Sequence, residues 1–263
     1  MTEADTIFGI MASLGREGYS VQALIRLAAP LGIAENTVRT TLHRMQKKGT
    51  IASRREGRQA VYHFTNKAVK ISGNVLKGFH TPDWSGWDNL WRGIIYSVPE
   101  TNKPLRHRIR TKLALYRYRP LYPGFWIRPY KENDDDPNDW TDDTKTACSD
   151  IVVFTPETPF AKKRIQELWQ VEQVNRGMAG VCRQIQKEAA AAKSISPEEA
   201  FKRKIITGEK AVASLFSDPL LPDEYLPNDW NAVQLRILFQ DFDAVMTKIA
   251  GPFISKILEE VEE

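Results

Sequence analysis

The residues with the clearest capacity for chemistry lie along one short segment, residues 35–48. At 100° per residue, Val38, Leu42 and Met45 fall on one side of a helix, and polar and basic side chains fall on the other. Such polar side chains can reach base edges and phosphates when a helix enters a DNA major groove. The candidate DNA-contacting residues of this segment are Asn36, Thr37, Arg39, Thr40, His43, Arg44 and Lys47.

A β-hairpin is predicted directly after this helix. Two short strand-like runs, residues 51–55 and 59–65, flank a Glu56-Gly57 turn. We expect its basic tip to hold the DNA backbone as a wing, through Arg54, Arg55 and Arg58. The alternative is a helical bundle whose charged face is only solvated. The order of elements and the basic tip together favour DNA.

The elements before this helix supply its scaffold, and the charge pattern supports the same partner. Helices are predicted over residues 5–14 and 20–28, with Ser20 as an N-cap and a turn at Pro30 and Gly32. Residues 35–67 hold eight Lys or Arg against two Glu, a local charge of +6 in a chain whose net charge is +4. Because this positive charge is concentrated in one segment, a nucleic-acid phosphate backbone is the favoured partner.

A second group of residues combines tryptophan with arginine. Trp84, Trp87 and Trp91 are close in sequence, and Trp126 could join them. They form either an aromatic core or the wall of a pocket for a large anionic ligand, whose charge arginine suits. The candidate effector-binding residues are Trp87, Trp91, Arg92, Arg106 and Arg128.

Signals for catalysis and for metal binding are weak. There is no phosphate-cradling glycine loop and no nucleophile elbow, and the four histidines are scattered. Two cysteines, Cys148 and Cys182, are too few for a zinc site or a disulfide framework. We therefore expect no enzyme activity, no metal and no cofactor. Without a signal peptide or a membrane span, a cytoplasmic location is expected.

The rest of the chain predicts a mixed region followed by helices. Strands are expected over residues 91–98, 121–127 (with a bulge or turn at Pro123-Gly124) and 151–154, a basic helix over 105–116, and an acidic loop over 132–143. Later helices cover residues 160–193, the stretch after Ser196, and 231–249, where Gly251-Pro252 is expected to break the chain before a final helix.

Two apolar stripes could support a homodimer, which would read two DNA half-sites. One is a three-four spaced seam, and it could equally pack within its own chain. The other is the amphipathic helix near the C-terminus. The seam comprises Val171, Val174, Met178, Val181 and Ile185, and the second stripe comprises Leu235, Leu238, Phe242, Val245 and Ile249.

Several separated motifs in one order resemble the PaaX family, the repressors of phenylacetate-degradation operons. They read WSGWDNLWR at residues 84–92, YSVPE at 96–100, PGFWIRP at 123–129 and DPLLPDEYLPNDW at 218–230, together with residues 106–113. The chain departs from the family at Asn89, where Gly is common, and at residues 116–120, where the family often has a glycine-rich stretch.

This resemblance implies an N-terminal winged helix-turn-helix, a central ferredoxin-like domain and a helical C-terminal domain. We therefore predict an α+β protein with a DNA-binding domain (residues 1–67), a connector (68–84), a central domain (85–175) and a C-terminal domain (176–263). The resemblance also implies a dimeric repressor that phenylacetyl-coenzyme A or a related thioester releases from operator DNA. The alternative is a metal-dependent nucleic-acid-processing enzyme built on the central domain.

Overall fold

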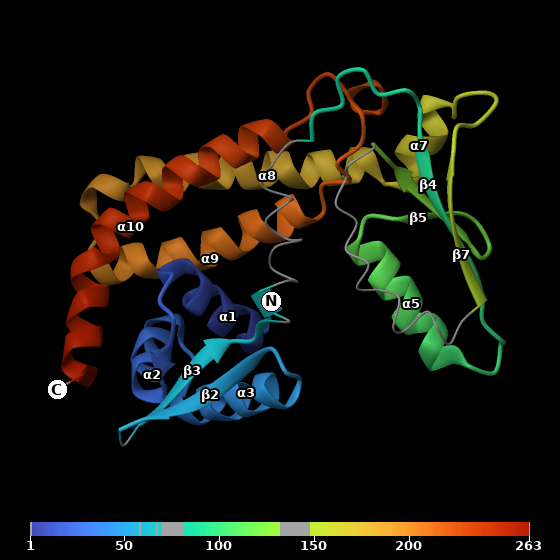
Figure 1. Ribbon diagram of the computed structural model, residues 1–263. Coiled ribbons are helices and arrows are strands. Elements are labelled where there is room, and N and C mark those ends of the chain that lie inside the picture. The colour runs from blue at the N-terminus through green and yellow to red at the C-terminus, as the bar shows by residue number, and fades with distance from the viewer. Residues whose placement is uncertain (1, 58, 67, 70–81, 132–147, 263) are drawn as a thin grey trace. The chain divides into compact units, whose positions relative to one another are not determined.

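The protein mixes helices and strands and belongs to the α+β class (Figure 1). The computed structural model describes residues 2–57, 59–66, 68–69, 82–131 and 148–262. The chain divides into two compact units. One comprises residues 1–80, 176–217 and 231–263, and the other comprises residues 81–175 and 218–230. Most of the predicted connector, the acidic loop and Arg58 lie outside the described residues.

The first unit begins with helices and a small sheet, much as the sequence predicts. Ser20 caps the second helix by accepting a hydrogen bond from the Ala23 backbone N–H at 3.2 Å. Gly32 and Gly49 end the second and third helical segments with φ of +76° and +70°, in the left-handed region that glycine adopts without strain. The elements are α1 (Glu3–Leu14), β1 (Tyr19–Ser20), α2 (Val21–Ala28), η1 (Ala29–Leu31), α3 (Glu35–Lys47), β2 (Ile51–Glu56) and β3 (Gln59–Phe64).

The hairpin is confirmed, and a third strand extends it. Strands β2 and β3 pair antiparallel from Ile51 opposite Phe64 to Glu56 opposite Gln59. The two-residue strand β1 pairs with the other edge of β3, so the order is β1-β3-β2. Gly18, beside β1, lies so close to the Val61 side chain that an added Cβ would come within 2.5 Å of it. This extra strand was not predicted from the sequence.

Long helices complete the first unit. Figure 1 draws α8 (Val171–Ala190), α9 (Pro197–Phe216) and α10 (Ala232–Glu262) as the yellow-to-red part of the chain, with η3 (Ala192–Ser194) between α8 and α9. Of the predicted seam, Val171, Met178 and Ile185 are buried within the single chain. Burial within the chain favours internal packing, the alternative that the sequence had left open.

The predicted break at Gly251-Pro252 is wrong, because α10 continues through both residues to Glu262. Proline removes one backbone donor and bends a helix, and Figure 1 shows that α10 curves along its length. Packing on both sides of the proline keeps the helix intact, since Ala250 and Ile257 are buried. Near its end, the Glu260 carboxylate accepts from Arg26 of α2 at 2.5 Å.

The second unit is built on a four-stranded antiparallel sheet of order β5-β6-β4-β7. The Pro123-Gly124 signal proves to be a turn between two strands, with Gly124 at a φ of +78°. The predicted single strand over residues 121–127 is therefore a hairpin. The elements are β4 (Trp91–Ser97), α5 (Lys103–Leu115), β5 (Arg119–Tyr122), β6 (Phe125–Pro129), β7 (Cys148–Phe154), α7 (Lys162–Leu168) and the short η4 (Asp223–Tyr225).

Each face of this sheet has its own core. Helix α5 covers the face that carries Ile94, Tyr96 and Trp126. Helix α7 and the 218–230 segment cover the opposite face, where Trp91 and Ile127 are fully buried. Successive strand residues point to opposite faces, so the near-continuous apolar run of β4 serves both cores.

Candidate nucleic-acid interface

Helix α3 has the two-faced character that the sequence predicts. Val38, Leu42 and Met45 are buried, with exposed fractions of at most 5%. Thr41 is buried as well, which the sequence did not indicate. Of the predicted contact residues, Thr37 is half-buried and the others are exposed: Asn36, Arg39, Thr40, His43, Arg44 and Lys47.

Two cations on this face have weak partners among the described residues. Arg39 donates to the Glu35 carboxylate at 2.8 and 3.0 Å, and Arg44 donates to the Thr41 hydroxyl at 3.1 Å. An exposed ion pair four residues apart on a helix contributes only about 0.3–0.5 kcal/mol. Arg39 can therefore exchange Glu35 for a phosphate at little cost.

The hairpin tip adds two further cations. Arg54 and Arg55 are exposed at the end of β2. Arg54 pairs with Glu56 at 2.5 Å, and Arg55 donates to the Gly57 carbonyl at 3.2 Å. Both contacts are local and open to solvent. Arg58, the third predicted wing residue, lies outside the described residues.

Side-chain contacts that the sequence did not reveal orient these elements. Gln46 of α3 donates to the Ser53 hydroxyl of β2 at 3.1 Å, which fixes the hairpin relative to the helix. The Tyr19 hydroxyl donates to the Met11 carbonyl at 3.2 Å and accepts from the Arg16 backbone N–H at 3.0 Å. Burial raises the pKa of this tyrosine, so the hydroxyl keeps its proton and the donor.

The predicted effector residues do not share one surface. Arg92 and Arg128 lie opposite each other in the β4–β6 register, so they point to one face of the sheet. Trp91 points to the other face, where it is fully buried and packs edge-on against Trp87 with ring centroids 5.6 Å apart. The sheet therefore separates these tryptophans from the arginines.

The three predicted arginines already contact neighbours within the unit. The Arg92 guanidinium lies 5.2 Å from the Tyr130 ring centroid, and that of Arg128 lies 5.3 Å from the Tyr118 ring centroid. Arg106, on α5, donates to the Val98 carbonyl at 3.4 Å. The contacts of Arg92 and Arg128 are typical of cations that stabilise aromatic packing.

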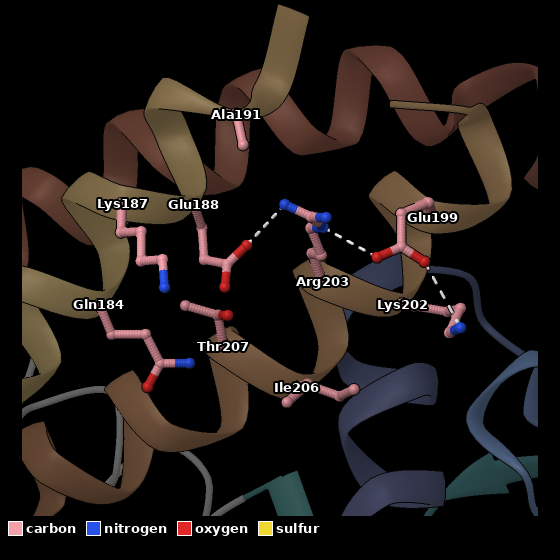
Figure 2. A pocket seen from close by; sticks show the side chains of 9 residues that line it. All are labelled: Gln184, Lys187, Glu188, Ala191, Glu199, Lys202, Arg203, Ile206 and Thr207. Atoms are coloured by element: carbon pink, nitrogen blue, oxygen red, sulfur yellow. Dashed lines mark hydrogen bonds and ion pairs between the residues drawn. The ribbon is translucent and has the colours of Figure 1, made fainter. Parts of the chain in front are cut away.

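A different concave site lies between α8 and α9, within the first unit (Figure 2). Its volume is about 480 Å³, within the range of small-molecule sites. Lysine, arginine, glutamate and amide side chains dominate the lining, which no sequence motif indicated. It consists of Gln184, Lys187, Glu188, Ala191, Glu199, Lys202, Arg203, Ile206 and Thr207.

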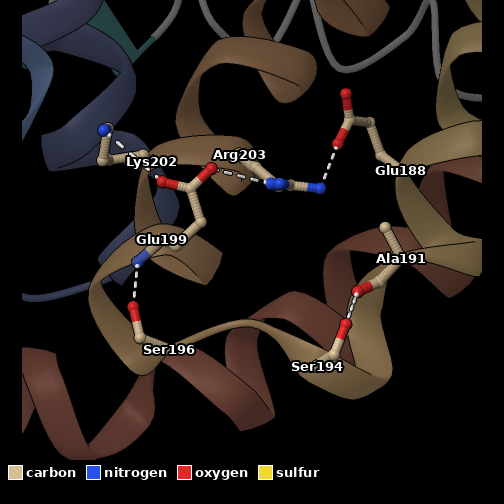
Figure 3. A network of polar contacts seen from close by, with 7 residues as sticks. All are labelled: Glu188, Ala191, Ser194, Ser196, Glu199, Lys202 and Arg203. Atoms are coloured by element: carbon tan, nitrogen blue, oxygen red, sulfur yellow. Dashed lines mark hydrogen bonds and ion pairs between the residues drawn. The ribbon is translucent and has the colours of Figure 1, made fainter.

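An ion-pair network shapes this cavity, as Figure 3 shows. Arg203 donates to Glu188 of α8 at 2.8 Å and to Glu199 of its own helix at 2.9 Å, so it joins the two helices. The hydrogen bond from Arg203 holds the pKa of Glu199 below its usual value. Glu199 also sits in the first turn of α9, where Ser196 caps its backbone N–H at 3.2 Å.

Family models match most of the chain. Residues 5–68 match the model described as PaaX-like protein, residues 85–157 the PaaX protein central Cas2-like domain, and residues 167–256 the PaaX-like protein C-terminal domain. The chain belongs to the PaaX family. Because all three PaaX models match in order, the resemblance seen in the sequence motifs is confirmed over nearly the whole chain.

One curated relative and one solved structure are similar to this PaaX-family chain over most of its length. The transcriptional repressor PaaX of Escherichia coli K12 is 23% identical over 252 residues, which cover 89% of this chain and 76% of the relative. A solved structure of an uncharacterized protein from Mycobacterium tuberculosis aligns with a TM-score of 0.60 at 22% identity, and the match covers 94% of this chain and 96% of that one. The second likeness concerns the fold alone.

The described residues of this PaaX-family chain contain neither a membrane-spanning helix nor a metal-binding cluster. No described helix combines the length and the apolar character that crossing a bilayer requires. Among the same residues, no group of three or more His, Cys, Asp or Glu side chains is placed to bind a metal ion.

Proposed function

We propose that the protein is a transcriptional repressor that binds operator DNA through a winged helix-turn-helix formed by residues 1–67. The observation that carries this proposal is the division of α3 into a buried apolar face and an exposed polar, basic face, next to a basic hairpin tip. In this arrangement α2 and α3 form the helix-turn-helix, and the β2–β3 hairpin is the wing. Membership of the PaaX family and the repressor relative support a regulator rather than an enzyme.

The two parts of this surface have different roles in the proposal. Helix α3 enters the major groove, where Arg39, His43 and Arg44 read base edges. The wing holds the backbone through Arg54 and Arg55 and carries no sequence information. Base contacts set specificity, and phosphate contacts set the salt dependence.

Titration of labelled DNA from upstream of the protein's own gene, at several salt concentrations, tests these roles. We expect Arg44→Ala to cost about 1–3 kcal/mol and to relax the choice of sequence. Arg55→Ala should weaken binding to all sequences and lower the salt slope by about 0.9. Lys163→Ala, an exposed cation on α7, is the matched control. Unchanged affinity and slope in both test variants would refute the assignment.

We further propose that an acyl-coenzyme A, with phenylacetyl-coenzyme A as the first candidate, releases the repressor from DNA. A releasing ligand must bind the DNA-free state more tightly than the DNA-bound state. Two sites are candidates: the arginine face of the central sheet, with Arg92 and Arg128, and the α8–α9 cavity around Arg203. The cavity lies on α9, which also packs against α1 of the DNA-binding segment.

Calorimetric titration of phenylacetyl-coenzyme A and related thioesters into three proteins separates these sites. Loss of binding in Arg92→Ala alone would favour the sheet, and loss in Arg203→Ala alone would favour the cavity. If no thioester bound the unmodified protein, the effector proposal would fail while the DNA-binding proposal could stand.

A homodimer is the proposed assembly, because a two-fold protein can read two half-sites. On α10, Leu235 and Phe242 are buried within the chain, whereas Val245 is exposed. Light scattering at micromolar concentration, with and without DNA, tests the assembly. A monomer under both conditions would refute it.

A further inference from the structure

Helix α5 of the second unit and the residues that flank it have an unusual charge composition. Residues 101–120 contain seven Lys or Arg and no Asp or Glu. Together with the +6 of residues 35–67, this +7 exceeds the net charge of +4, so the other residues sum to −9. The positive excess of the chain therefore lies in two separate segments, and only one belongs to the proposed winged helix.

We propose that the outer face of α5 is a second surface for duplex DNA, which binds the phosphate backbone without reading sequence. This inference rests on the proposed function, and it adds a contact outside the winged helix.

The helix directs its cations away from its own core. Leu105, Ile109 and Leu113 are buried against the sheet. At 100° per residue, Lys103 and Arg110 lie along one edge of the exposed surface, and Arg108 lies along the other edge. His107 lies between these two edges. All four of these side chains are exposed. Lys103 and Arg110 are seven residues apart, so they span about 10 Å of helix axis, a length over which a DNA strand presents several phosphates.

These cations are not neutralised within the described part of the chain. No described carboxylate lies within 4.0 Å of Lys103, Arg108 or Arg110. Arg110 donates from Nε to the Tyr96 hydroxyl at 3.4 Å, which orients the guanidinium and leaves its charge uncompensated. A group of exposed, uncompensated cations is the feature that a polyanion recognises.

The shape of the face favours duplex DNA over a small anionic ligand. Small ligands bind in concave sites, where several groups converge on one point. The exposed cations of α5 instead lie along two edges of the convex outer surface of a helix, which suits the extended phosphate backbone of a duplex. Backbone contacts of this kind make binding tighter on every sequence and steeper in its response to salt.

The experiment compares salt slopes of DNA binding for the full-length chain and two charge-neutralised variants. The first is Lys103→Gln/Arg108→Gln/Arg110→Gln. The second, Lys103→Gln/Arg108→Gln, keeps the contact between Arg110 and Tyr96. The control removes the same charge elsewhere through Lys163→Gln/Arg183→Gln/Lys248→Gln, three exposed residues outside α5. Circular dichroism and thermal unfolding establish that each variant is folded.

At about 0.9 per phosphate contact, we expect the slope of log K against log salt to fall by about 2.7 in the triple variant and about 1.8 in the double variant. Between 50 and 200 mM salt, the triple variant should then lose about 40-fold less affinity than the unmodified protein does. The loss should be equal on operator and unrelated duplexes, and the control should behave like the unmodified protein.

An unchanged slope in the folded α5 variants would overturn this inference. If Arg44→Ala still relaxed the choice of sequence in that case, the proposed function would stand without this inference. If the unmodified protein bound no DNA, both would fall. If the α5 variants lost binding of phenylacetyl-coenzyme A and kept the DNA slope, the face would serve a small anion, which also overturns the inference.

Discussion

Asn89 combines two structural roles that substitution can separate. Its backbone has a φ of +62°, in the left-handed region that side chains with a Cβ disfavour. Its side-chain oxygen accepts a hydrogen bond from the Trp91 indole N–H at 2.9 Å. Trp91 is fully buried at the centre of an aromatic core, so its indole N–H depends on partners within the protein.

The two contributions have separate magnitudes. Ala in the left-handed region costs roughly 1–2 kcal/mol, and a buried donor left without a partner costs about 1–3 kcal/mol. Asn89→Ala loses the hydrogen bond and the better tolerance that Asn has for this conformation, so we expect a loss of about 1–5 kcal/mol in the free energy of unfolding. Asn89→Gly relieves the backbone and loses only the hydrogen bond, while Asn89→Asp keeps an acceptor. The expected order of stability is therefore Asn and Asp, then Gly, then Ala.

Urea unfolding followed by tryptophan fluorescence measures this order, with the midpoint and the m-value compared among the four proteins. If the Gly and Ala variants were equally stable, the backbone contribution would be absent. If the Asp and Ala variants were equally stable, the hydrogen bond to Trp91 would contribute nothing. Either result would refute the corresponding half of the argument.

Four further substitutions test other buried or half-buried positions. Burial raises the pKa of Glu209 above its usual 4.5; the Thr6 side chain opposes this rise, and the Asp5 charge adds to it. The carboxyl therefore destabilises the fold as pH rises through the raised pKa. Glu209→Gln should be the more stable protein at pH 7, and unfolding measurements near pH 4 should show no gain. An added Cβ at Gly93 would lie 2.5 Å from the Phe125 ring, so Gly93→Ala should lower the urea midpoint through overpacking by about 1–3 kcal/mol, and an unchanged midpoint would contradict this. Lys204 is buried and pairs with the half-exposed Asp243, so Asp243→Ala should cost more than Lys204→Met in thermal unfolding, and the reverse order would show that the buried ammonium needs no partner.

Local signals accounted for much of the first unit and its candidate site. The three-four spacing of Val38, Leu42 and Met45 predicted which face of α3 is buried, because a helix carries its periodicity wherever it packs. Ser20 and Gly49 marked helix ends through backbone requirements that act within a few residues. The exposed basic face of α3 followed from the same pattern, without knowledge of the rest of the fold.

At two positions that depart from the family motifs, the sequence did not predict the backbone conformation. Asn89 has a positive φ, and so does Arg117, within the segment where the family often carries glycine. Glycine adopts this conformation without strain, and Asn tolerates it better than most residues. The sequence marked both positions as unusual, but only the folded chain shows that the left-handed conformation is their common feature.

Tertiary packing decided the features that depend on distant residues. Gly251-Pro252 predicts a helix end by its own chemistry, yet buried contacts on both sides carry α10 through it. Trp91 and Arg92 are adjacent in sequence, and the β4 pleat sends them to opposite faces of the sheet. The sequence by itself determined the periodic helix faces, the caps and the concentration of charge, since these depend on neighbours along the chain. Only the tertiary structure decided which of those faces meet, because burial of apolar surface is a property of residues that the fold brings together.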